Sequence, residues 1–467
     1  MITDLKPYEA YKESGLPWLG RVPSHWELIP NRGLVRRRKV LVGQRHSDYQ
    51  LLSLTKQGVI VRDISQGGKF SSDMGTSQEV RKGDLIFCLF DVPETPRTVG
   101  LSRHDGMITG AYTVFEFLGT GSPDYFDLFY RAMDDRKLLS PLYSGLRNTI
   151  PAERFRAAKT PQPPSNEQGA IVRFLNWANA RLERAIRGKQ SVIALVNQQK
   201  QAVIYRAVTR GLDSSVPLKP SGIPWLGGIP QHWEMRRLKT LCQFVTSGSR
   251  GWARYYSDAG SVFLRIGNIS TTSIDLRLKR ITYVTPPAGA EGERTRAIPN
   301  DLLLSITAQI GAVGVVPDGL GEAFVNQHTA LIRLRPQWCV PRWVAYGLLS
   351  QFGKDQCWLK TNGGTKVGLT LDDVRCLLVP LPPFDEQLKL VAGIEDQTRD
   401  LDLATSRLER EIELLREYGT CLVADVVTGK LDVRTAAARL PEEAAPDVAP
   451  DDAELIEETE PAEEEVV

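Results

Sequence analysis

The sequence predicts a mixed α/β protein, in which two tandem-duplicated globular domains are separated by two long antiparallel coiled-coil helices with pseudo-two-fold symmetry. Three observations support this prediction. A tryptophan-containing segment occurs twice, a Pro-Pro segment that opens a long apolar stripe occurs twice, and the stretches between them hold short apolar runs bounded by Gly, Asp or Asn. The length of 467 residues suits about three folding units at roughly 150 residues each.

The first repeated segment lies near the N-terminus and again near the middle of the chain. Residues 14–27 read SGLPWLGRVPSHWE and residues 221–234 read SGIPWLGGIPQHWE, with ten of fourteen positions identical. An internal repeat fixes the architecture, so it is identified before any local assignment. His25 and His232 occupy equivalent places and suit anchoring better than proton transfer. Packing or a protein interface also suits the tryptophans better than base stacking: Trp18, Trp26, Trp225 and Trp233.

The second repeated segment recurs at an offset of 219 residues. Residues 161–168 read PQPPSNEQ and residues 380–387 read PLPPFDEQ. A shorter echo follows at the same offset, where VTRGLD at 208–213 matches VTGKLD at 427–432. The chain is therefore a tandem duplication of about 210 to 220 residues.

A long helix is expected after each Pro-Pro pair. Two prolines can precede a helix but cannot continue one, and Asn166 and Asp385 follow at the same repeat position as N-cap candidates. Gly211 and Gly429 are natural stops. About 45 residues at 1.5 Å each make a rod of roughly 65 Å, and neither rod can bury its apolar stripe alone, so the two should pack on each other. The expected helix-helix seam consists of Ile171, Leu175, Leu182, Ile186, Ile193, Val196, Leu390, Ile394, Leu401, Leu408, Ile412 and Leu415.

The stretches between these landmarks are predicted to be mixed α/β bodies with unrelated loops. Strands are expected at 51–54, 84–87, 262–266 and 302–306, and helices at 125–139 and 343–352. The expected divisions are an N-terminal Pro-Trp segment at 1–27, a first globular domain at 28–160, a first long helix at 161–213, a second Pro-Trp segment and globular domain at 214–379, a second long helix at 380–432 and an acidic disordered tail at 433–467.

Composition and charge predict a cytoplasmic protein that binds a polyanionic partner. The chain is 42% hydrophobic and 24% charged, and it has neither a membrane-length apolar run nor the apolar core of a secretory signal, so we expect a cytoplasmic protein. Six scattered cysteines without a C-x-x-C pair predict reduced, buried thiols. Residues 1–441 carry 58 Lys and Arg against 44 Asp and Glu, a net charge of +14, which favours a polyanionic partner. Residues 442–467 hold twelve acidic residues and no basic ones.

Motifs for catalysis are scarce. The sequence has no Gly-rich loop ending in Gly-Lys-Ser/Thr and no Asn/Asp-Pro-Pro-aromatic quartet, so we expect neither a nucleotide nor S-adenosylmethionine on this chain, and no metal. One string, Pro123-Asp124 followed by Asp135 and Lys137, loosely fits a metal-dependent nuclease. The residues between the two acids have helical spacing, whereas such sites place the second acid and the lysine on a core strand.

Binding of double-stranded DNA has more support, because loops of both bodies interleave basic, polar, aromatic and glycine residues. Arg and Lys can neutralise phosphates or pair with guanine edges, Asn can pair with adenine, and glycines let a loop approach a groove. Two aromatic residues are possible groove wedges, Trp252 and Tyr255. The other expected contacts are Lys56, Arg62, Lys69, Arg250, Arg254, Asn268 and Lys366.

These paired motifs resemble the specificity subunits of type I restriction-modification systems. The resemblance rests on the two SG[LI]PWLG-x-[VI]P-x-HWE segments, the two P-x-PP-x-x-EQ segments and the two Thr-x-x-Leu-Asp endings, and it spans about residues 10–432. It implies two target-recognition domains that each read one half of a bipartite DNA site, and a helix pair that acts as a ruler and docks two modification (methyltransferase) subunits. Because the loops of the two bodies differ, the site should be asymmetric and interrupted.

The resemblance also implies that this chain is not an enzyme. S-adenosylmethionine would then be held by the modification subunits, and ATP and Mg by restriction (translocase/nuclease) subunits of the larger complex. Two interpretations from other classes stay open. A stand-alone nuclease using Asp124, Asp135 and Lys137 would cut DNA with Mg²⁺ and no partner, whereas a coiled-coil adaptor whose globular bodies bind protein would show affinity independent of salt and DNA sequence.

Overall fold

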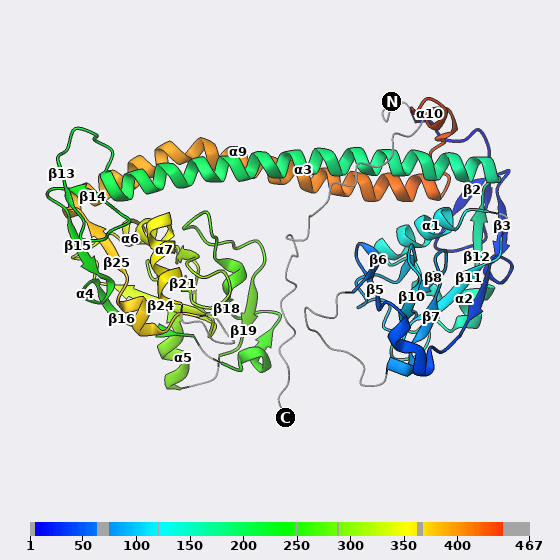
Figure 1. Ribbon diagram of the computed structural model, residues 1–467, viewed down its shortest axis with the longest axis horizontal. Helices are drawn as coiled ribbons and strands as arrows, with labels where there is room; N and C mark the ends of the chain where they lie inside the picture. Colours follow the sequence, from blue (N-terminus) through cyan, green and yellow to red (C-terminus); the bar gives the residue numbers. More distant parts are fainter. Residues whose placement is uncertain are drawn as a thin grey trace. The chain divides into compact units, whose positions relative to one another are not determined.

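The computed structural model (Figure 1) describes residues 5–62, 74–119, 121–248, 250–286, 289–361 and 368–441. The chain divides into two compact units. The first unit takes the chain up to Gly188 and returns from Glu411 onward, and the second unit holds Lys189–Arg410. These boundaries fall inside the two long helices, so each helix contributes one half to each unit.

Each unit contains a four-stranded antiparallel sheet with the same topology. The order is β4-β11-β8-β9 in the first unit and β16-β24-β21-β22 in the second. The central strands β8 and β21 are fully buried, which explains their continuous apolar sequences. The bounds in the first unit are β4 Val35–Arg38, β8 Leu85–Phe87, β9 Val99–Leu101 and β11 Thr113–Phe117; in the second they are β16 Cys242–Ser247, β21 Leu302–Ser305, β22 Val313–Val315 and β24 Thr329–Leu334.

Two smaller strand pairs also occur in both units. In the first unit β1 (Tyr11–Glu13) pairs with β2 (Arg21–Pro23), and β3 (Glu27–Pro30) pairs with β12 (Lys159–Gln162). The second unit repeats both antiparallel pairs, with the bounds β13 Leu218–Pro220, β14 Gly228–Pro230, β15 Glu234–Arg237 and β25 Leu378–Leu381. In both units, the strand after the Pro-Trp segment therefore lies beside the strand that leads into a long helix.

The units differ in their remaining strands. The first unit has two separate antiparallel pairs, β5-β6 and β7-β10. The second unit has one five-stranded sheet, β17-β19-β18-β23-β20, in which β18 and β23 are parallel. The duplicated scaffold thus carries different second layers, whose strands are β5 Leu52–Thr55, β6 Gly58–Val61, β7 Gln78–Val80, β10 Gly106–Ile108, β17 Tyr256–Ser257, β18 Ser261–Leu264, β19 Thr282–Val284, β20 Arg296–Ala297 and β23 Ala323–Val325.

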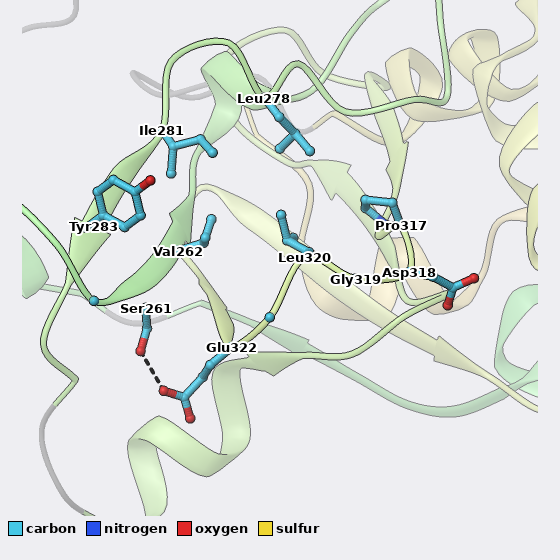
Figure 2. Close-up of a pocket in the computed structure, with 12 residues that line it drawn as sticks. Ser261, Val262, Leu278, Ile281, Tyr283, Pro317, Asp318, Gly319, Leu320 and Glu322 are labelled. Carbon is cyan, nitrogen blue, oxygen red and sulfur yellow. Dashed lines mark hydrogen bonds between the residues drawn. The ribbon is translucent and has the colours of Figure 1, made fainter.

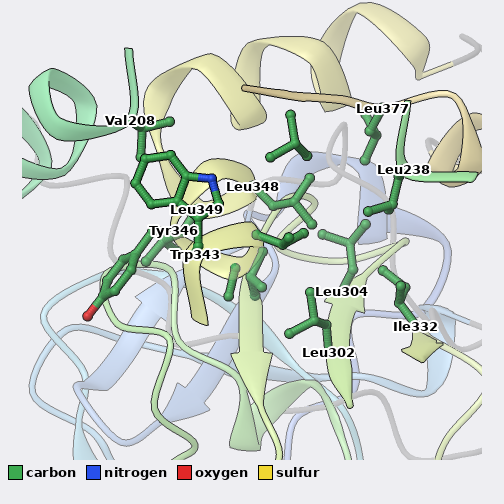
Figure 3. Packing of buried hydrophobic residues seen from close by; sticks show 14 of the residues in the cluster. Val208, Leu238, Leu302, Leu304, Ile332, Trp343, Tyr346, Leu348, Leu349 and Leu377 are labelled. Carbon is green, nitrogen blue, oxygen red and sulfur yellow. The ribbon is translucent and has the colours of Figure 1, made fainter. Parts of the chain in front are cut away.

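Short helices cover the four-stranded sheets. In the first unit α1 packs on β9, and Ser122 caps it by accepting the Tyr125 N–H at 3.3 Å. In the second unit α6 packs on β22, and Figure 3 shows its Trp343 with Leu302 and Leu304 of β21 in the core. The short helices are α1 Pro123–Asp135, α2 Ala152–Ala157, α4 Leu238–Leu241, α5 Ala290–Thr295, α6 Pro341–Leu349, α7 Gln351–Lys360, α8 Leu371–Arg375 and α10 Arg434–Ala438.

The long helices are α3 (Ser165–Arg210) and α9 (Phe384–Val427), and they run antiparallel. In the first unit Gly419 lies close to Leu182, and a Cβ atom on this glycine would be 3.3 Å from the leucine Cδ1. In the second unit Lys200 Nζ donates to Asp402 Oδ1 at 2.5 Å. As residue numbers rise along α3, those of its partners on α9 therefore fall.

All twelve predicted seam residues are buried or half-buried. Five of them are buried: Ile171, Leu175, Leu390, Ile394 and Ile412. The other seven are half-buried: Leu182, Ile186, Ile193, Val196, Leu401, Leu408 and Leu415. The half-buried ones lie between residues 182 and 196 of α3 and between residues 401 and 415 of α9.

The ends of the long helices differ in part from the expectation. Both helices begin two residues earlier than these N-cap candidates predict, at Ser165 and Phe384, so Asn166 and Asp385 lie in the first turn and are not the N-caps. The reason is that the Pro164 carbonyl already accepts the N–H groups of Glu167 and Gln168, which starts the helical hydrogen bonds at the proline. The C-terminal stops lie where the glycines predict, with Gly211 at φ +76° and Gly429 at φ +78°.

Part of the segment expected to be a disordered tail is folded. Residues 433–441 include α10, and Val433, Ala437 and Leu440 are buried in the core of the first unit. Arg173 of α3 donates to the Ala437 carbonyl. The acidic stretch 442–467 lies outside the described residues.

Candidate nucleic-acid interface

The two repeated motifs meet at one buried carboxylate in the first unit. Glu167, from the EQ pair at the start of α3, is 3% exposed. Its Oε1 accepts hydrogen bonds from Trp26 Nε1 at 2.8 Å and from the Tyr8 hydroxyl at 2.6 Å, and its Oε2 is 2.9 Å from His25 Nε2. Burial, with the neighbouring Glu167 carboxylate, raises the pKa of Tyr8 well above its ordinary value, so the phenol stays a donor. The Pro-Trp segment is thereby fastened to the helix start.

The same joint occurs in the second unit. Glu386 Oε1 accepts from Trp233 Nε1 at 3.0 Å, and its Oε2 is 2.7 Å from His232 Nε2. The adjacent glutamines also repeat their contacts: Gln168 Nε2 donates to the Pro163 carbonyl, and Gln387 Nε2 donates to the Pro382 carbonyl. The joint, defined by Glu167 with its partners and by Glu386 with its partners, bears out the anchoring role predicted for the histidines.

The four tryptophans do not share one environment. Trp26 and Trp233 are fully buried, as expected of packing residues. Trp18 is half-buried, with its ring 6.2 Å from that of Phe129. Trp225 is 51% exposed, so it does not pack in a core, and for this residue the protein-interface alternative stays a prediction.

In the first unit, two predicted DNA contacts lie on or beside the β5-β6 hairpin. Lys56 is exposed in the turn between the strands, and Arg62 is half-buried just after β6, where its N–H donates to the Leu51 carbonyl at 2.8 Å. Leu54 and Val59 of this hairpin pack on Gly100 of β9. The third predicted contact, Lys69, lies outside the described residues.

In the second unit, predicted contacts gather in the loop between β16 and β17. Arg250 and Arg254 are exposed, and the Arg254 guanidinium lies over the ring of the half-buried Tyr255 at 4.9 Å. This loop leaves β16 at Gly248, where a side chain would overlap the Val325 and Asn326 carbonyls. Lys366 lies outside the described residues.

Two predicted contacts require correction because their side chains are buried. Trp252 is 2% exposed and stacks on Phe263 at 5.7 Å, so it forms the base of the loop and is not available as a groove wedge. Asn268 is 6% exposed; its Oδ1 accepts the Arg265 N–H, and its Nδ2 donates to the Arg277 and Arg280 carbonyls. The amide shapes the loop and does not pair with a base.

The loop that Asn268 shapes presents cations that the sequence analysis missed. Arg277, Lys279 and Arg280 are all exposed there. The signal was present as the basic run RLKR at 277–280, but only the hydrogen bonds of Asn268 show that this run is held in one place. The basic run at 36–39 behaves differently, because Arg36 pairs with Glu116 and Arg38 pairs with the buried Asp84. Arg37 and Lys39 are exposed and form no ion pair among the described residues.

The residues of the nuclease-like string are engaged in separate ion pairs. Asp124 pairs with Arg103, and Asp135 Oδ1 pairs with Arg97 at 2.7 Å. Lys137 Nζ donates to Asp134 Oδ1 at 2.8 Å. Asp124 and Asp135 lie at opposite ends of α1, so the helix does not bring them to one metal. Across the described ranges, no group of three or more His, Cys, Asp or Glu side chains is placed to hold a metal ion.

The second unit also has a shallow groove of about 600 Å³ with a mostly apolar floor (Figure 2). Val262, Leu278 and Leu320 line it. Two carboxylates, Asp318 and Glu322, lie at its edge, and Glu322 Oε2 accepts from Ser261 Oγ at 2.5 Å. Acidic groups repel phosphate, so this groove is not part of the candidate interface.

The fold and the loops together define a class of protein: a duplicated α/β scaffold whose two units differ in their second layers and carry exposed Lys and Arg side chains in their loops. No family model matches the chain, and no helix in the described part is long and apolar enough to cross a membrane. The chain is similar to specificity subunits of type I restriction enzymes. It is 22% identical to the type I restriction enzyme EcoBI specificity subunit of Escherichia coli over 281 residues. This aligned region covers 58% of each chain.

Two further relatives carry the same description. A putative type I restriction enzyme MjaX specificity subunit of Methanocaldococcus jannaschii is 23% identical over 62% of this chain and 63% of its own. The matches to the EcoBI and MjaX subunits therefore span less than two thirds of those relatives. The type I restriction enzyme EcoKI specificity subunit of Escherichia coli K12 is 21% identical over 88% of this chain and 90% of its own.

A solved structure agrees on the fold. This structure concerns the complex assembly and conformational transition of the type I R-M system. One of its chains aligns with the present chain at a TM-score of 0.51 and 15% identity, over 88% of this chain and 99% of that chain. The mixed α/β fold with long connecting helices is thus one that a type I R-M protein also has.

Proposed function

We propose that this chain is the DNA-specificity subunit of a type I restriction-modification complex, is not itself an enzyme, and reads an asymmetric, bipartite site in double-stranded DNA. The single observation that carries the proposal is the joint that occurs twice. Glu167 and Glu386 hold equivalent Pro-Trp segments on equivalent helix starts, while the second layers of the two units differ. One scaffold with two surfaces suits two different half-sites.

The two surfaces are the candidate reading loops. In the first unit they are the β5-β6 hairpin with Lys56 and the exposed Arg37 and Lys39, and in the second unit the loops at 250–256 and 277–280. Their cations supply phosphate neutralisation and base contacts. Lys69 and Lys366 are proposed as further contacts to DNA phosphates or bases.

The helix pair α3 and α9 acts as spacer and docking surface in this proposal. Several of its apolar side chains face water: Val192 is 45% exposed, Leu195 65%, Leu403 50% and Leu414 47%. Exposed apolar rows on a helix pair are suited to bind further helices. We assign them to two methyltransferase subunits, which would carry S-adenosylmethionine. Restriction subunits with ATP and Mg complete the proposed complex in the cytoplasm.

Methylation sequencing tests the proposal. DNA from cells that express this chain with its neighbouring methyltransferase is compared with DNA from cells that lack only this chain. We expect a methylated adenine in each half of an interrupted, asymmetric motif, only when the chain is present. Absence of any motif despite a stable complex would overturn the assignment as specificity subunit, and absence of a complex would favour a protein-binding adaptor.

A further inference from the structure

Three polar side chains are linked by hydrogen bonds at one end of the four-stranded sheet of the second unit. Thr307 Oγ1 is 3.0 Å from His328 Nδ1, and Gln327 Nε2 is 3.0 Å from His328 Nε2. Thr307 follows β21, whereas Gln327 and His328 directly precede β24, which pairs with β21. All three residues are half-buried, so each remains partly accessible. We call these three residues the polar triplet.

The backbone of the two loops that carry the polar triplet is joined and anchored. The His328 carbonyl accepts the Ile306 N–H at 3.1 Å. Thr329 closes the turn before β24, because its N–H donates to the Asn326 carbonyl at 3.2 Å and its hydroxyl donates to Asn326 Oδ1 at 3.0 Å. The Asn326 N–H donates in turn to the Leu264 carbonyl at 3.1 Å. The side chains are therefore presented from a fixed base, and a ligand that receives them need not order the loops.

The hydrogen bonds determine which atoms of the Gln327 amide remain free. An amide NH₂ group can only donate, so the neutral imidazole of His328 accepts at Nε2 and carries its proton on Nδ1, which donates to Thr307 Oγ1. Among the described residues, Gln327 Oε1 accepts no hydrogen bond, and its Nε2 has a second hydrogen to donate. One acceptor and one donor are thus available to a ligand. The major-groove edge of adenine offers the complementary pair, N6 as donor and N7 as acceptor.

One neighbour of the polar triplet is the loop that is predicted to contact DNA through Arg250. This loop begins at Gly248, whose N–H donates to the Thr329 carbonyl at 3.3 Å. A side chain on Gly248 would overlap the Asn326 carbonyl, so only glycine permits this close approach. The start of the loop is therefore in contact with the turn before β24.

The other neighbour is the segment that follows Lys366, a second predicted DNA contact. Gly368 lies two residues after Lys366, and a Cβ atom on this glycine would be 3.2 Å from the Ile306 carbonyl oxygen and 4.0 Å from Thr307 Cγ2. The Leu369 N–H donates to the same Ile306 carbonyl at 2.8 Å. Segments that lead to predicted DNA contacts thus adjoin the polar triplet on both sides.

The duplicated scaffold does not need the polar triplet in order to fold. The matching strands β11 and β24 both begin at a threonine, so Ala111 and Tyr112 occupy the places of Gln327 and His328. The first unit forms a four-stranded sheet of the same topology with these residues. The difference between the two copies suits residues that read only one of two unlike half-sites.

We infer that Gln327 reads an adenine in the major groove of the half-site bound by the second unit, with His328 and Thr307 as positioning residues that orient its amide. The inference rests on the proposed function and specifies one base contact within it. Gln327 Oε1 accepts from adenine N6 while its Nε2 donates to adenine N7. Guanine presents two acceptors at this edge, O6 and N7, so the amide oxygen would face another acceptor. The contact therefore favours A·T over G·C at one position.

The test uses the complex of the full chain with its methyltransferase subunits and unmethylated duplexes that carry the motif found by methylation sequencing. Each A·T pair of the motif is replaced in turn by G·C, and each adenine by 7-deazaadenine, which lacks the N7 acceptor. At one pair, in one half of the motif, wild type should lose about tenfold in affinity on exchange to G·C. The 7-deazaadenine duplex should also bind more weakly at that pair. Gln327→Ala should bind the motif about tenfold more weakly and should no longer distinguish A·T from G·C there.

Two further variants separate base reading from folding. His328→Phe keeps a ring but removes both hydrogen bonds, so it should relax the same position and leave the discrimination at all other positions unchanged, which a loss of fold would not do. Gln351→Ala is the matched control, because Gln351 is an exposed glutamine of the same unit whose Nε2 donates to Asp355 Oδ1. This control should behave as wild type at every position.

The outcomes distinguish the base contact from the proposed function. If the wild-type complex shows no sequence-specific binding, both are overturned. If the complex binds specifically and Gln327→Ala keeps the wild-type discrimination at every A·T pair, only the base contact is overturned. A motif in which no adenine is sensitive to the loss of N7 also overturns the base contact alone, and this result needs no variant protein.

Discussion

Burial at single residues determines which thiols of this protein react. Cys242, Cys339 and Cys357 are at most 5% exposed, and burial raises the pKa of each thiol to about 12. At pH 8 only about one in 10⁴ of these groups would be a thiolate, the reactive form. Cys421, on α9, is exposed, an exception to the buried state that the sequence predicts for all six.

We therefore expect iodoacetamide to modify Cys421 first and to leave Cys242, Cys339 and Cys357 unmodified in the folded protein. The measurement is peptide mass spectrometry over a time course at pH 8. Cys421→Ser should remove the fast phase. Modification of Cys357 at the rate of Cys421 would contradict the buried assignment.

Asp127 has a buried carboxyl group, and its charged form lowers the stability of the first unit. It lies on α1 and is 8% exposed, and its Oδ1 has no hydrogen-bond partner among the described residues. Burial raises the pKa of its carboxyl, an effect that Arg131, with its Nη1 3.6 Å away, opposes. A raised pKa in the folded state means that Asp127 favours folding at acid pH, and that this contribution is lost as the pH rises through the folded value.

Asp127→Asn should stabilise the first unit by about 1 kcal/mol at pH 8, because the neutral amide avoids the buried charge. The gain should shrink toward pH 4, because the raised pKa of the wild-type carboxyl favours its neutral, protonated form as the pH falls. Thermal denaturation of Asp127→Asn and wild type at pH 8 and at pH 4 measures this gain in stability. Asp124→Asn is the control, because Asp124 pairs with Arg103 and should gain nothing. An equal gain at both pH values would disprove the titration argument.

At the scale of elements, the joint between each Pro-Trp segment and its helix should dominate local stability. Glu167→Ala leaves the buried Trp26 and Tyr8 donors without an acceptor, at about 1 to 3 kcal/mol for each. Glu386→Ala removes an acceptor that is 32% exposed and holds two partners, so water can replace part of it. We expect the first substitution to cost roughly twice the second.

Urea denaturation of the two variants beside wild type measures this difference. Glu167→Gln is the conservative control, because its amide oxygen can still accept one donor. Equal losses for Glu167→Ala and Glu386→Ala would mean that the third donor, Tyr8, adds nothing to the joint.

The joint also shows what could and could not be predicted from the sequence. Both of its motifs were identified from the repeat, the long helices from the Pro-Pro pairs and the apolar stripes that follow them, and strands such as β8 and β21 from short apolar runs. The contact between the motifs could not be predicted, because Trp26 and Glu167 are 141 residues apart and meet only through β3 and β12. Local composition marked Trp252 and Asn268 as contacts, but their burial depends on partners that the local sequence does not reveal.

At the scale of the whole molecule, each half of the chain completes a core of the other half. The last turns of α3 bury Ile204, Ala207 and Val208 in the second unit. The last turns of α9 bury Val426 and Val427 in the first unit. The segments around Lys6 and Asp432 also meet there, because the Asp432 N–H donates to the Lys6 carbonyl at 2.8 Å. Duplication has thus interlocked the two copies through their helices.

A cut in the covalent link between the copies should therefore leave the protein assembled. The link at Asp213–Leu218 is the place for an inserted protease site, because Ser214 and Ser215 are exposed there. We expect the two fragments to migrate together in size-exclusion chromatography after cleavage, since their separation would expose the apolar ends of α3 and α9 to water. Val208→Asp is the matched variant: it places a charge in the second core and should let the cleaved fragments separate, while the uncleaved chain stays one molecule. Separation of the wild-type fragments would show that the connecting link, and not the exchanged helix ends, holds the two copies together.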